Sequence, residues 1–97
     1  MTKLYIDTSN TQKITVGIGE NKVEEDAKQE RSQKLLSIIE RELNNNRLKL
    51  EDIDSINVNV GPGSFTGLRV GISVANALGW SLGIPVNGKR EIVQPKY

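Results

Sequence analysis

The stretch GPGSFTGLRVG, residues 61–71, joins a predicted strand to a predicted helix through a glycine-rich turn. Before it, Ser55–Val60 alternates polar and apolar residues, which is typical of a β-strand. After it, residues 70–82 carry no charge and their apolar residues have helical spacing. Pro62 stiffens the turn, and the glycines on either side of it accept backbone angles that other residues avoid. The stretch therefore predicts a strand-to-helix elbow.

The start of the predicted helix carries two hydroxyl side chains, and two interpretations of them stay open. Ser64 and Thr66 are candidate N-caps, which would satisfy free backbone N–H groups of the first helical turn. The same N–H groups and hydroxyls, beside Gly63, could instead receive a phosphate or a carboxylate. The segment lacks the lysine of the P-loop motif, which favours the structural interpretation.

Three strands are predicted before the first helix. Lys3–Asp7 and Lys13–Gly19 alternate apolar and polar residues, and the polar residues 8–11 between them indicate a hairpin. A third strand is predicted at Lys22–Asp26, where charges suit an exposed sheet edge because they discourage pairing with another chain. The outer sheet face is polar and contains Tyr5, Thr15, Asn57 and Asn59. A face built to be covered by a second subdomain would be apolar, so we expect a natural short form.

The first helix is predicted at Ser32–Asn45. Its apolar residues cover an arc of about 160° at 3.6 residues per turn, and they are Leu35, Leu36, Ile38, Ile39 and Leu43. This arc is wider than a minimal core stripe, so the helix can pack on the sheet and still present an apolar shoulder. A neighbouring helix in the same chain would be the simpler use of that shoulder. Residues 47–54 form a linker that its apolar residues pin to the core.

The second helix, Thr66–Leu82, is apolar all round and is therefore expected to be buried all round. Small residues recur every four positions, at Gly67, Gly71, Ala75 and Gly79, and such a stripe lets another helix approach closely. We expect that helix to come from another chain. The predicted interface consists of Leu35, Ile38, Ile39, Gly67, Gly71, Val74, Ala75 and Leu78.

A short fifth strand is predicted at Ile84–Asn87, and Lys89–Tyr97 is expected to be a loosely held tail. Residues 1–88 then form one domain in the order βββαβαβ. Right-handed crossovers place both helices on the same face of a mixed sheet. The fold class predicted from the sequence is therefore a two-layer α/β domain.

The composition excludes several kinds of chemistry. Lys and Arg number 13 against 12 Asp and Glu, and a net charge of +1 gives no electrostatic case for direct nucleic-acid binding. The absence of Cys and His removes disulfides, thiol catalysis, imidazole acid–base chemistry and the usual zinc ligands. We therefore predict no catalytic residue, no metal site and no cofactor.

No signal peptide is apparent, so we expect a cytoplasmic protein. Residues 70–88 are uncharged, but their polar residues, glycines and Pro85 argue against a membrane span.

The glycine-rich stretch and its surroundings resemble the TsaB (YeaZ) family, whose members act in the biosynthesis of threonylcarbamoyladenosine in tRNA. GPGSFTGLRVG is similar to the family signature, and LYIDTS at residues 4–9 is similar to its opening strand. RSQKLLSIIERELNNNRLKLEDID and NALGWSLGIPV resemble the first helix with its linker and the segment after the signature. The resemblance extends to about Val86 and covers the N-terminal subdomain of a family whose members usually carry a second one.

This resemblance implies one half of an actin-like ATPase fold, with strand order 3-2-1-4-5 and the second strand antiparallel. Actin-like and sugar-kinase-like proteins hold the metal and phosphates of ATP at the first loop, so Asp7 and Ser9 join Gly63, Ser64 and Thr66 as candidate phosphate-binding residues. Those proteins generally have glycine after the aspartate, where this chain has Thr8. Many TsaB relatives have a histidine where this chain has Arg31.

Three functional hypotheses follow. The first, implied by the resemblance, is a non-catalytic partner subunit that docks through its helices onto a TsaD-type catalytic subunit and forms a homodimer in isolation. The second is a phosphate- or nucleotide-binding half-domain of an actin-like enzyme. The third is a self-associating domain without a ligand. Recovery of a TsaD-like protein with the chain would favour the first, and ATP binding by the isolated chain would favour the second.

Overall fold

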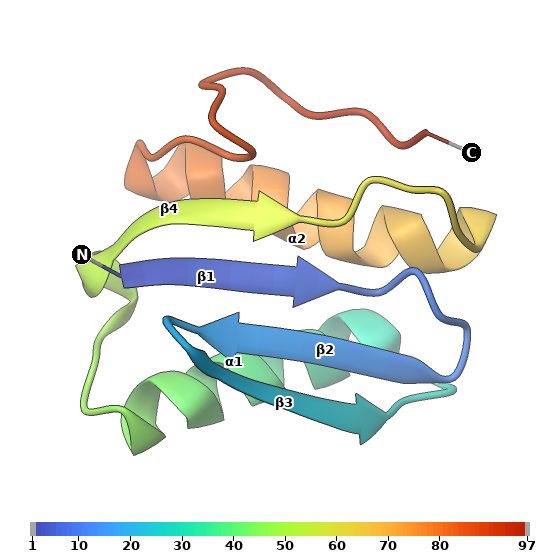
Figure 1. Ribbon diagram of the computed structural model, residues 1–97, viewed down its shortest axis with the longest axis horizontal. Helices are drawn as coiled ribbons and strands as arrows, with labels where there is room; N and C mark the ends of the chain where they lie inside the picture. The colour runs from blue at the N-terminus through green and yellow to red at the C-terminus, as the bar shows by residue number, and fades with distance from the viewer. Residues whose placement is uncertain (1, 97) are drawn as a thin grey trace.

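A four-stranded mixed sheet, covered on one face by two α-helices, makes up the fold (Figure 1). The computed structural model describes residues 2–96. The elements in chain order are β1 (Thr2–Asp7), β2 (Lys13–Ile18), β3 (Asn21–Asp26), α1 (Arg31–Asn45), the 3₁₀ turn η1 (Leu50–Asp52), β4 (Ile53–Val58) and α2 (Phe65–Leu82). The strands lie in the order β3-β2-β1-β4, and β1 is antiparallel to β2 and parallel to β4.

The core lies between the sheet and the helix layer, as the alternation of the strands predicts. The sheet contributes completely buried side chains such as Leu4, Ile6 and Ile14. Leu35 of α1 and Leu68 of α2 reach this layer from the other side and are also completely buried. Full burial of one such side chain stabilises the fold by about 1.5–3 kcal/mol. The predicted two-layer α/β class is confirmed.

The sheet face away from the helices is polar, as predicted. Tyr5 is half-buried there, and the Lys22 ammonium lies 4.6 Å from the centroid of its ring. Gly17 lies beneath this pair, because a Cβ at Gly17 would come within 3.2 Å of the Tyr5 Cβ and 3.1 Å of the Lys22 Cγ. The aromatic ring and the lysine stem together cover the one strand position that has no side chain of its own.

The predicted fifth strand is wrong, because only one residue of it pairs with the sheet. Val86 forms a single parallel bridge with Ile56, at the free edge of β4. The Asn87 side chain then takes over the pairing: its Oδ1 accepts from the Val58 N–H at 2.8 Å, and its Nδ2 donates to the Val58 carbonyl at 3.0 Å. The backbone turns back here, since Asn87 has φ 52° and Gly88 has φ 77°. A side-chain amide therefore ends the sheet where a strand was expected.

The C-terminal segment lies against α2 and the elbow rather than extending freely into solvent (Figure 1). The Asn76 side chain of α2 exchanges two hydrogen bonds of 3.1 Å with the backbone of Val93. The Lys96 N–H donates to the Val60 carbonyl at 2.6 Å. Hydrogen bonds thus attach the predicted tail to the rest of the chain at Val93 and Lys96, whereas Tyr97 lies outside the described residues.

Smaller differences concern element ends. β4 begins at Ile53, earlier than predicted, because the Ile53 side chain already belongs to the core as η1 ends. Both helices begin one residue earlier than predicted, at Arg31 and Phe65. Within residues 2–96, no helix combines the length and the apolar character that a membrane crossing requires.

Candidate functional site

The elbow forms as predicted, with Ser64 as the N-cap of α2. The Ser64 hydroxyl oxygen accepts a hydrogen bond from the Gly67 N–H at 3.2 Å, and Ser64 has an extended backbone. Thr66 lies within the first turn and is exposed, so it is not the cap. The sequence left both hydroxyls as candidate caps. Ser64 is the cap because it directly precedes Phe65, the first residue of α2.

The β1–β2 loop packs directly against the elbow. The Ser64 N–H donates to the Ser9 carbonyl at 3.1 Å, and a Cβ at Gly63 would lie 2.7 Å from the Ser9 Cβ. Four of the five candidate phosphate-binding residues therefore come together at the same end of the sheet, namely Asp7, Ser9, Gly63 and Ser64. Only Gly63, which has no side chain, allows the loops to approach this closely.

Asp7 is held as a carboxylate by its neighbours. Its Oδ1 accepts from the Ser9 N–H at 2.9 Å and from the Ser9 hydroxyl at 2.7 Å, and its Oδ2 accepts from the Tyr5 hydroxyl at 3.3 Å. Burial alone would raise the pKa of Asp7, but the hydrogen bonds from Ser9, Asn59 and Tyr5 outweigh it and lower the pKa below its ordinary value. Burial and the Asp7 charge together raise the pKa of the Tyr5 hydroxyl.

Three backbone N–H donors of this junction are already used within the chain. The N–H groups of Ser9, Ser64 and Gly67 all donate within the chain, to Asp7, Ser9 and Ser64 respectively. A phosphate would need these groups free. In the described residues, no cluster of three or more His, Cys, Asp or Glu side chains is arranged to hold a metal ion. The geometry therefore favours a structural junction between two loops.

Thr8 links this junction to α2, and sequence reasoning missed its role. Its side chain is completely buried, and its hydroxyl donates to the Gly67 carbonyl and accepts from the Gly71 N–H at 2.9 Å. In a regular α-helix those two groups bond to each other, so the Thr8 hydroxyl is positioned to join the helical ladder at this turn. Two glycines four residues apart, opposite a threonine at the end of a buried strand, are the signal that could have revealed it.

The small-residue stripe of α2 faces its own chain, which corrects the prediction that it meets a helix from another. A Cβ at Gly67 would lie 2.5 Å from the Thr8 carbonyl, and one at Gly71 would lie 2.7 Å from the Thr8 hydroxyl. A Cβ at Gly79 would lie 2.5 Å from the Val86 side chain. The glycines therefore let α2 approach β1 and the segment after α2 closely.

Arg31, at the start of α1, fastens the β1–β2 loop from the other side. Its Nη2 donates to the carbonyls of Thr8, Asn10 and Lys13 at 3.3, 2.7 and 3.2 Å. Its Nε and Nη1 are buried and have no hydrogen-bond partner among residues 2–96. Burial lowers the pKa of this guanidinium. Arg31 therefore holds in place the loop that carries Ser9.

Most of the predicted interface residues lie inside the chain. Seven of the eight are buried, namely Leu35, Ile38, Ile39, Gly67, Gly71, Val74 and Ala75, and Leu78 is half-buried. These side chains pack on the sheet and between the two helices, because the wide apolar arc of α1 is used mainly within the chain.

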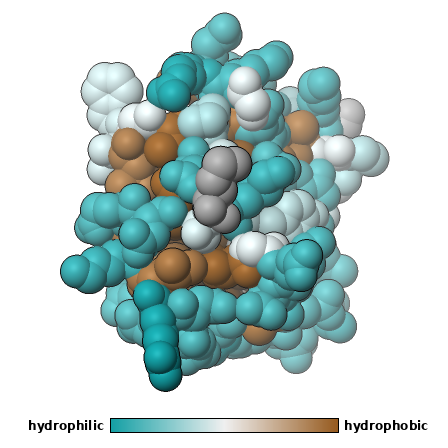
Figure 2. All heavy atoms as spheres, turned by 60° about the vertical axis from the view of Figure 1, so that its left-hand side comes forward, coloured by the Kyte–Doolittle hydropathy of each residue, from teal (hydrophilic) through white to brown (hydrophobic). Residues whose placement is uncertain are grey.

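Part of the apolar surface that remains on the helix layer forms a groove between α1 and α2, of about 420 Å³. It is lined by Leu36, Ile39, Leu43, Leu48, Leu50 and Leu78, with Glu40, Asn44 and Lys49 at its rim. Leu36 is 48% exposed, and no sequence argument had placed it in the interface. Figure 2 shows hydrophobic surface gathered in patches among hydrophilic side chains on the side of the molecule that it brings forward.

Comparison with known proteins gives the family. The sequence model described as TsaD, tRNA N6-adenosine threonylcarbamoyltransferase, matches residues 8–89. The chain belongs to this family. It is similar to the tRNA threonylcarbamoyladenosine biosynthesis proteins TsaB of Buchnera aphidicola, with 37% identity over 89 residues, and of Bacillus subtilis, with 36% identity over 96 residues. These matches cover 88% and 90% of this chain but only 42% and 40% of the relatives.

A solved structure agrees with the sequence matches. YeaZ from Pseudomonas aeruginosa superimposes with a TM-score of 0.75 at 30% sequence identity, over 88% of this chain and 41% of that one. The chain thus spans about two fifths of the length of its TsaB relatives, and the resemblance to the TsaB (YeaZ) family is confirmed.

Proposed function

We propose that the chain acts in threonylcarbamoyladenosine biosynthesis as a non-catalytic subunit that docks on a TsaD-type catalytic subunit. The apolar α1–α2 groove carries this proposal. Leu36 protrudes from α1 beside Leu78 of α2, and a groove of this kind on a small domain gains free energy when a partner covers it. A cytoplasmic location fits such a role, since the relatives are named for tRNA modification.

The family match supports the choice of partner. The chain itself matches the sequence model named for the transferase, so a TsaD-type subunit is expected to contain a related helix layer. Two related layers can pack with their grooves facing each other across a pseudo-two-fold axis. The same geometry would allow a homodimer when no TsaD-type subunit is present.

The loop junction supports a role without chemistry at Asp7. Its carboxylate accepts hydrogen bonds from Ser9 and Tyr5, and the Ser9 and Ser64 N–H groups donate within the chain. Binding of a phosphate would require these hydrogen bonds to be exchanged. We therefore assign the junction to holding α2 on the sheet, which in turn shapes the groove.

The test is titration calorimetry of the purified chain with the TsaD-type transferase of the same cell. Leu36→Glu places a charge in the groove and should weaken binding about tenfold or more, because a buried unpaired carboxylate is costly. Phe65→Glu is the matched control: it also converts an exposed apolar residue of the helix layer, 55% exposed, but lies at the elbow. Equal affinity of both variants and the wild type would contradict docking through the groove.

A separate titration with ATP addresses the enzyme hypothesis. We expect no heat of binding from the isolated chain. Saturable ATP binding that Asp7→Asn abolishes would favour a nucleotide-binding half-domain instead.

A further inference from the structure

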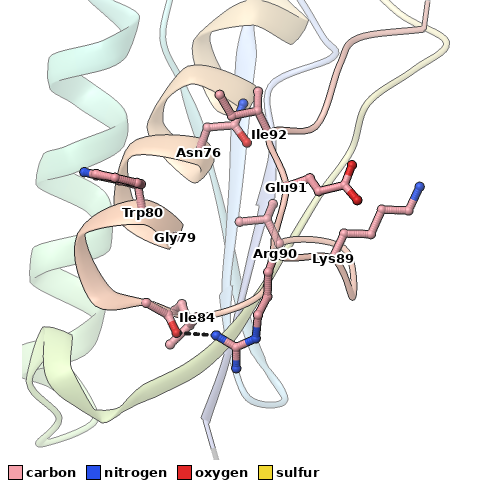
Figure 3. A pocket seen from close by; sticks show the side chains of 10 residues that line it. Asn76, Gly79, Trp80, Ile84, Lys89, Arg90, Glu91 and Ile92 are labelled. Carbon is pink, nitrogen blue, oxygen red and sulfur yellow. Dashed lines mark hydrogen bonds between the residues drawn. The ribbon is translucent and has the colours of Figure 1, made fainter.

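A second pocket lies on the opposite side of α2 from the groove, between the end of the helix and the C-terminal segment (Figure 3). It has a volume of about 280 Å³. Gly79 and Val86 contribute to its apolar lining, and Trp80 and Ile92 stand at its edges. Figure 3 shows Trp80 projecting from α2 on one side, while Lys89 and Glu91 extend on the other. The pocket is therefore large enough for one bulky side chain. One of its walls carries an aromatic residue and the other carries charged residues.

The apolar rim of this pocket is unusually exposed. Trp80 is 89% exposed and Ile92 is 73% exposed, the two highest values among the large apolar residues that the structure describes. Exposed apolar residues that stand singly need no explanation, but these two line the same pocket. Tryptophan is also the residue type most enriched where a partner contributes binding energy.

The charged residues that line the pocket are Lys89, Arg90 and Glu91, which give it a net charge of +1. Residues 55–97 contain four basic residues and one acidic residue, a net charge of +3, with Lys89 and Arg90 at the pocket. The first 54 residues contain nine basic and eleven acidic residues, a net charge of −2, which together give the +1 of the whole chain. Within residues 2–96, neither Lys89 nor Arg90 forms an ion pair, and Glu91 forms none either. The positive charge of this half is therefore not neutralised inside the chain.

Arg90 is fixed in place at the pocket wall. Its Nη1 donates to the carbonyl of Gly83, which caps the end of α2, at 2.7 Å (Figure 3). A guanidinium that is already ordered loses less conformational entropy when it binds a carboxylate. The pocket thus combines an apolar cavity, an exposed tryptophan and a positioned cation.

We propose that this pocket binds an acidic peptide segment of a partner protein through one bulky apolar side chain. The apolar side chain fills the cavity beside Trp80 and Ile92, and flanking Asp or Glu residues lie against Arg90 and Lys89. A nucleic-acid strand fits less well, because the cavity lining is apolar and Glu91 stands among the few charges at the pocket. This surface is distinct from the α1–α2 groove, so the proposal goes beyond docking on a TsaD-type subunit.

The test begins with a random-peptide display library selected on the full chain. The expected enriched peptides carry Leu, Ile, Phe or Trp next to Asp or Glu. A synthetic peptide of the consensus sequence is then titrated, with the fluorescence of Trp80, the only tryptophan of the chain, as the reporter. Because Trp80 is exposed, binding should shift its emission to shorter wavelength.

Charge reversal provides the matched variants. Arg90→Glu should weaken the peptide about tenfold or more, since an attraction is replaced by a like-charge contact. Lys28→Glu makes the same change of charge in the exposed loop between β3 and α1 and should leave affinity unchanged. If Arg90→Glu does not fold, as judged by circular dichroism, Lys89→Glu replaces it. A peptide in which lysine replaces the acidic residues should prefer Arg90→Glu to the wild type.

Several results would overturn the proposal. They are a selection without enrichment, enriched peptides without acidic residues, and equal peptide affinity of the wild type and the charge-reversed variant. Tighter binding of a single-stranded RNA oligonucleotide than of the peptide would identify a nucleic-acid site instead. A blue shift that grows with the concentration of the chain alone would identify a second copy as the occupant.

Discussion

Thr8 shows how one hydroxyl can position a helix. It lies between the Gly67 carbonyl and the Gly71 N–H of α2 while its own backbone carbonyl accepts from Arg31. This single residue therefore connects β1, α1 and α2. It also occupies the position at which glycine is the usual residue in actin-like nucleotide-binding proteins, and its methyl group, 3.3 Å from the position of a Cβ at Gly71, fills space at the junction.

Thr8→Val tests this role, because valine keeps the shape but removes the hydroxyl. We expect the free energy of unfolding to fall by roughly 1–2 kcal/mol, the net worth of two hydrogen bonds that the helix only partly recovers. Thr8→Ser is the complementary variant, because it keeps the hydroxyl and removes the methyl group. Urea unfolding measures both variants, and a Thr8→Val variant as stable as the wild type would remove the assigned role.

Ser64→Ala and Thr66→Ala form a matched pair at the elbow. Loss of the Ser64 cap should lower the free energy of unfolding by about 1 kcal/mol. Thr66 is exposed in the first turn, so its replacement should change stability by less than half as much. Thermal unfolding distinguishes the two, and the reverse ranking would place the cap at Thr66.

Asp7 makes the free energy of unfolding depend on pH. Its pKa is lowered in the folded state, so its stabilising contribution is present above the unfolded pKa of about 4 and is lost as the pH falls through the folded value. The difference in unfolding free energy between the wild type and Asp7→Asn should therefore be largest near neutral pH and shrink below about pH 4. A difference that stays constant from neutral pH to pH 3 would show that the carboxylate charge contributes nothing.

At the level of elements, α2 packs on the sheet through glycines, at Gly67 and Gly71, as well as through large side chains such as Leu68. The alternation of apolar and polar residues in the strands, and the helical spacing of apolar residues, were enough to predict five of the six strands and α-helices closely. The predicted start of β4 was two residues too late, because the local pattern does not distinguish Ile53, a core residue, from a linker residue. The fifth strand was wrong because a side chain, Asn87, competes with the backbone for Val58, and local propensity does not express that competition.

The residues predicted to form the interface lie mostly inside the chain, for a related reason. Helical periodicity gives the faces of α2 but not what covers each of them. The close contacts of Gly67 and Gly71 with Thr8 depend on residues about 60 positions apart in the chain, which no local pattern joins. The junction of Asp7, Ser9, Gly63 and Ser64 could be grouped from the family resemblance, whereas its internal hydrogen bonds required the structure.

Gly71→Ala tests the tight contact of α2 with β1. Alanine is the better helix former by about 1 kcal/mol, yet its Cβ would lie 2.7 Å from the Thr8 hydroxyl and 3.0 Å from the Ile6 side chain. We expect overpacking to win and the free energy of unfolding to fall by roughly 1–3 kcal/mol. Ser73→Ala, on the exposed face of the same helix, should be neutral or slightly stabilising. A stabilised Gly71→Ala variant would contradict the geometry.

At the level of the whole molecule, α2 separates two surfaces of different character. Leu78 contributes to the groove beside α1, and Trp80 contributes to the pocket beside the C-terminal segment. The opposite face of the sheet is polar, with Lys22 over Tyr5. The apolar surface available for binding is therefore concentrated on the helix layer.

Hydrogen–deuterium exchange of the chain mixed with the TsaD-type transferase tests docking through the groove most directly. We expect slower exchange from the second half of α1 through Leu48 and around Leu78, and unchanged exchange in β3 on the far edge of the sheet. Leu36→Glu should abolish that protection and Phe65→Glu should retain it. Unchanged exchange in α1 at saturating transferase, or protection confined to the polar sheet face, would contradict the proposed docking surface.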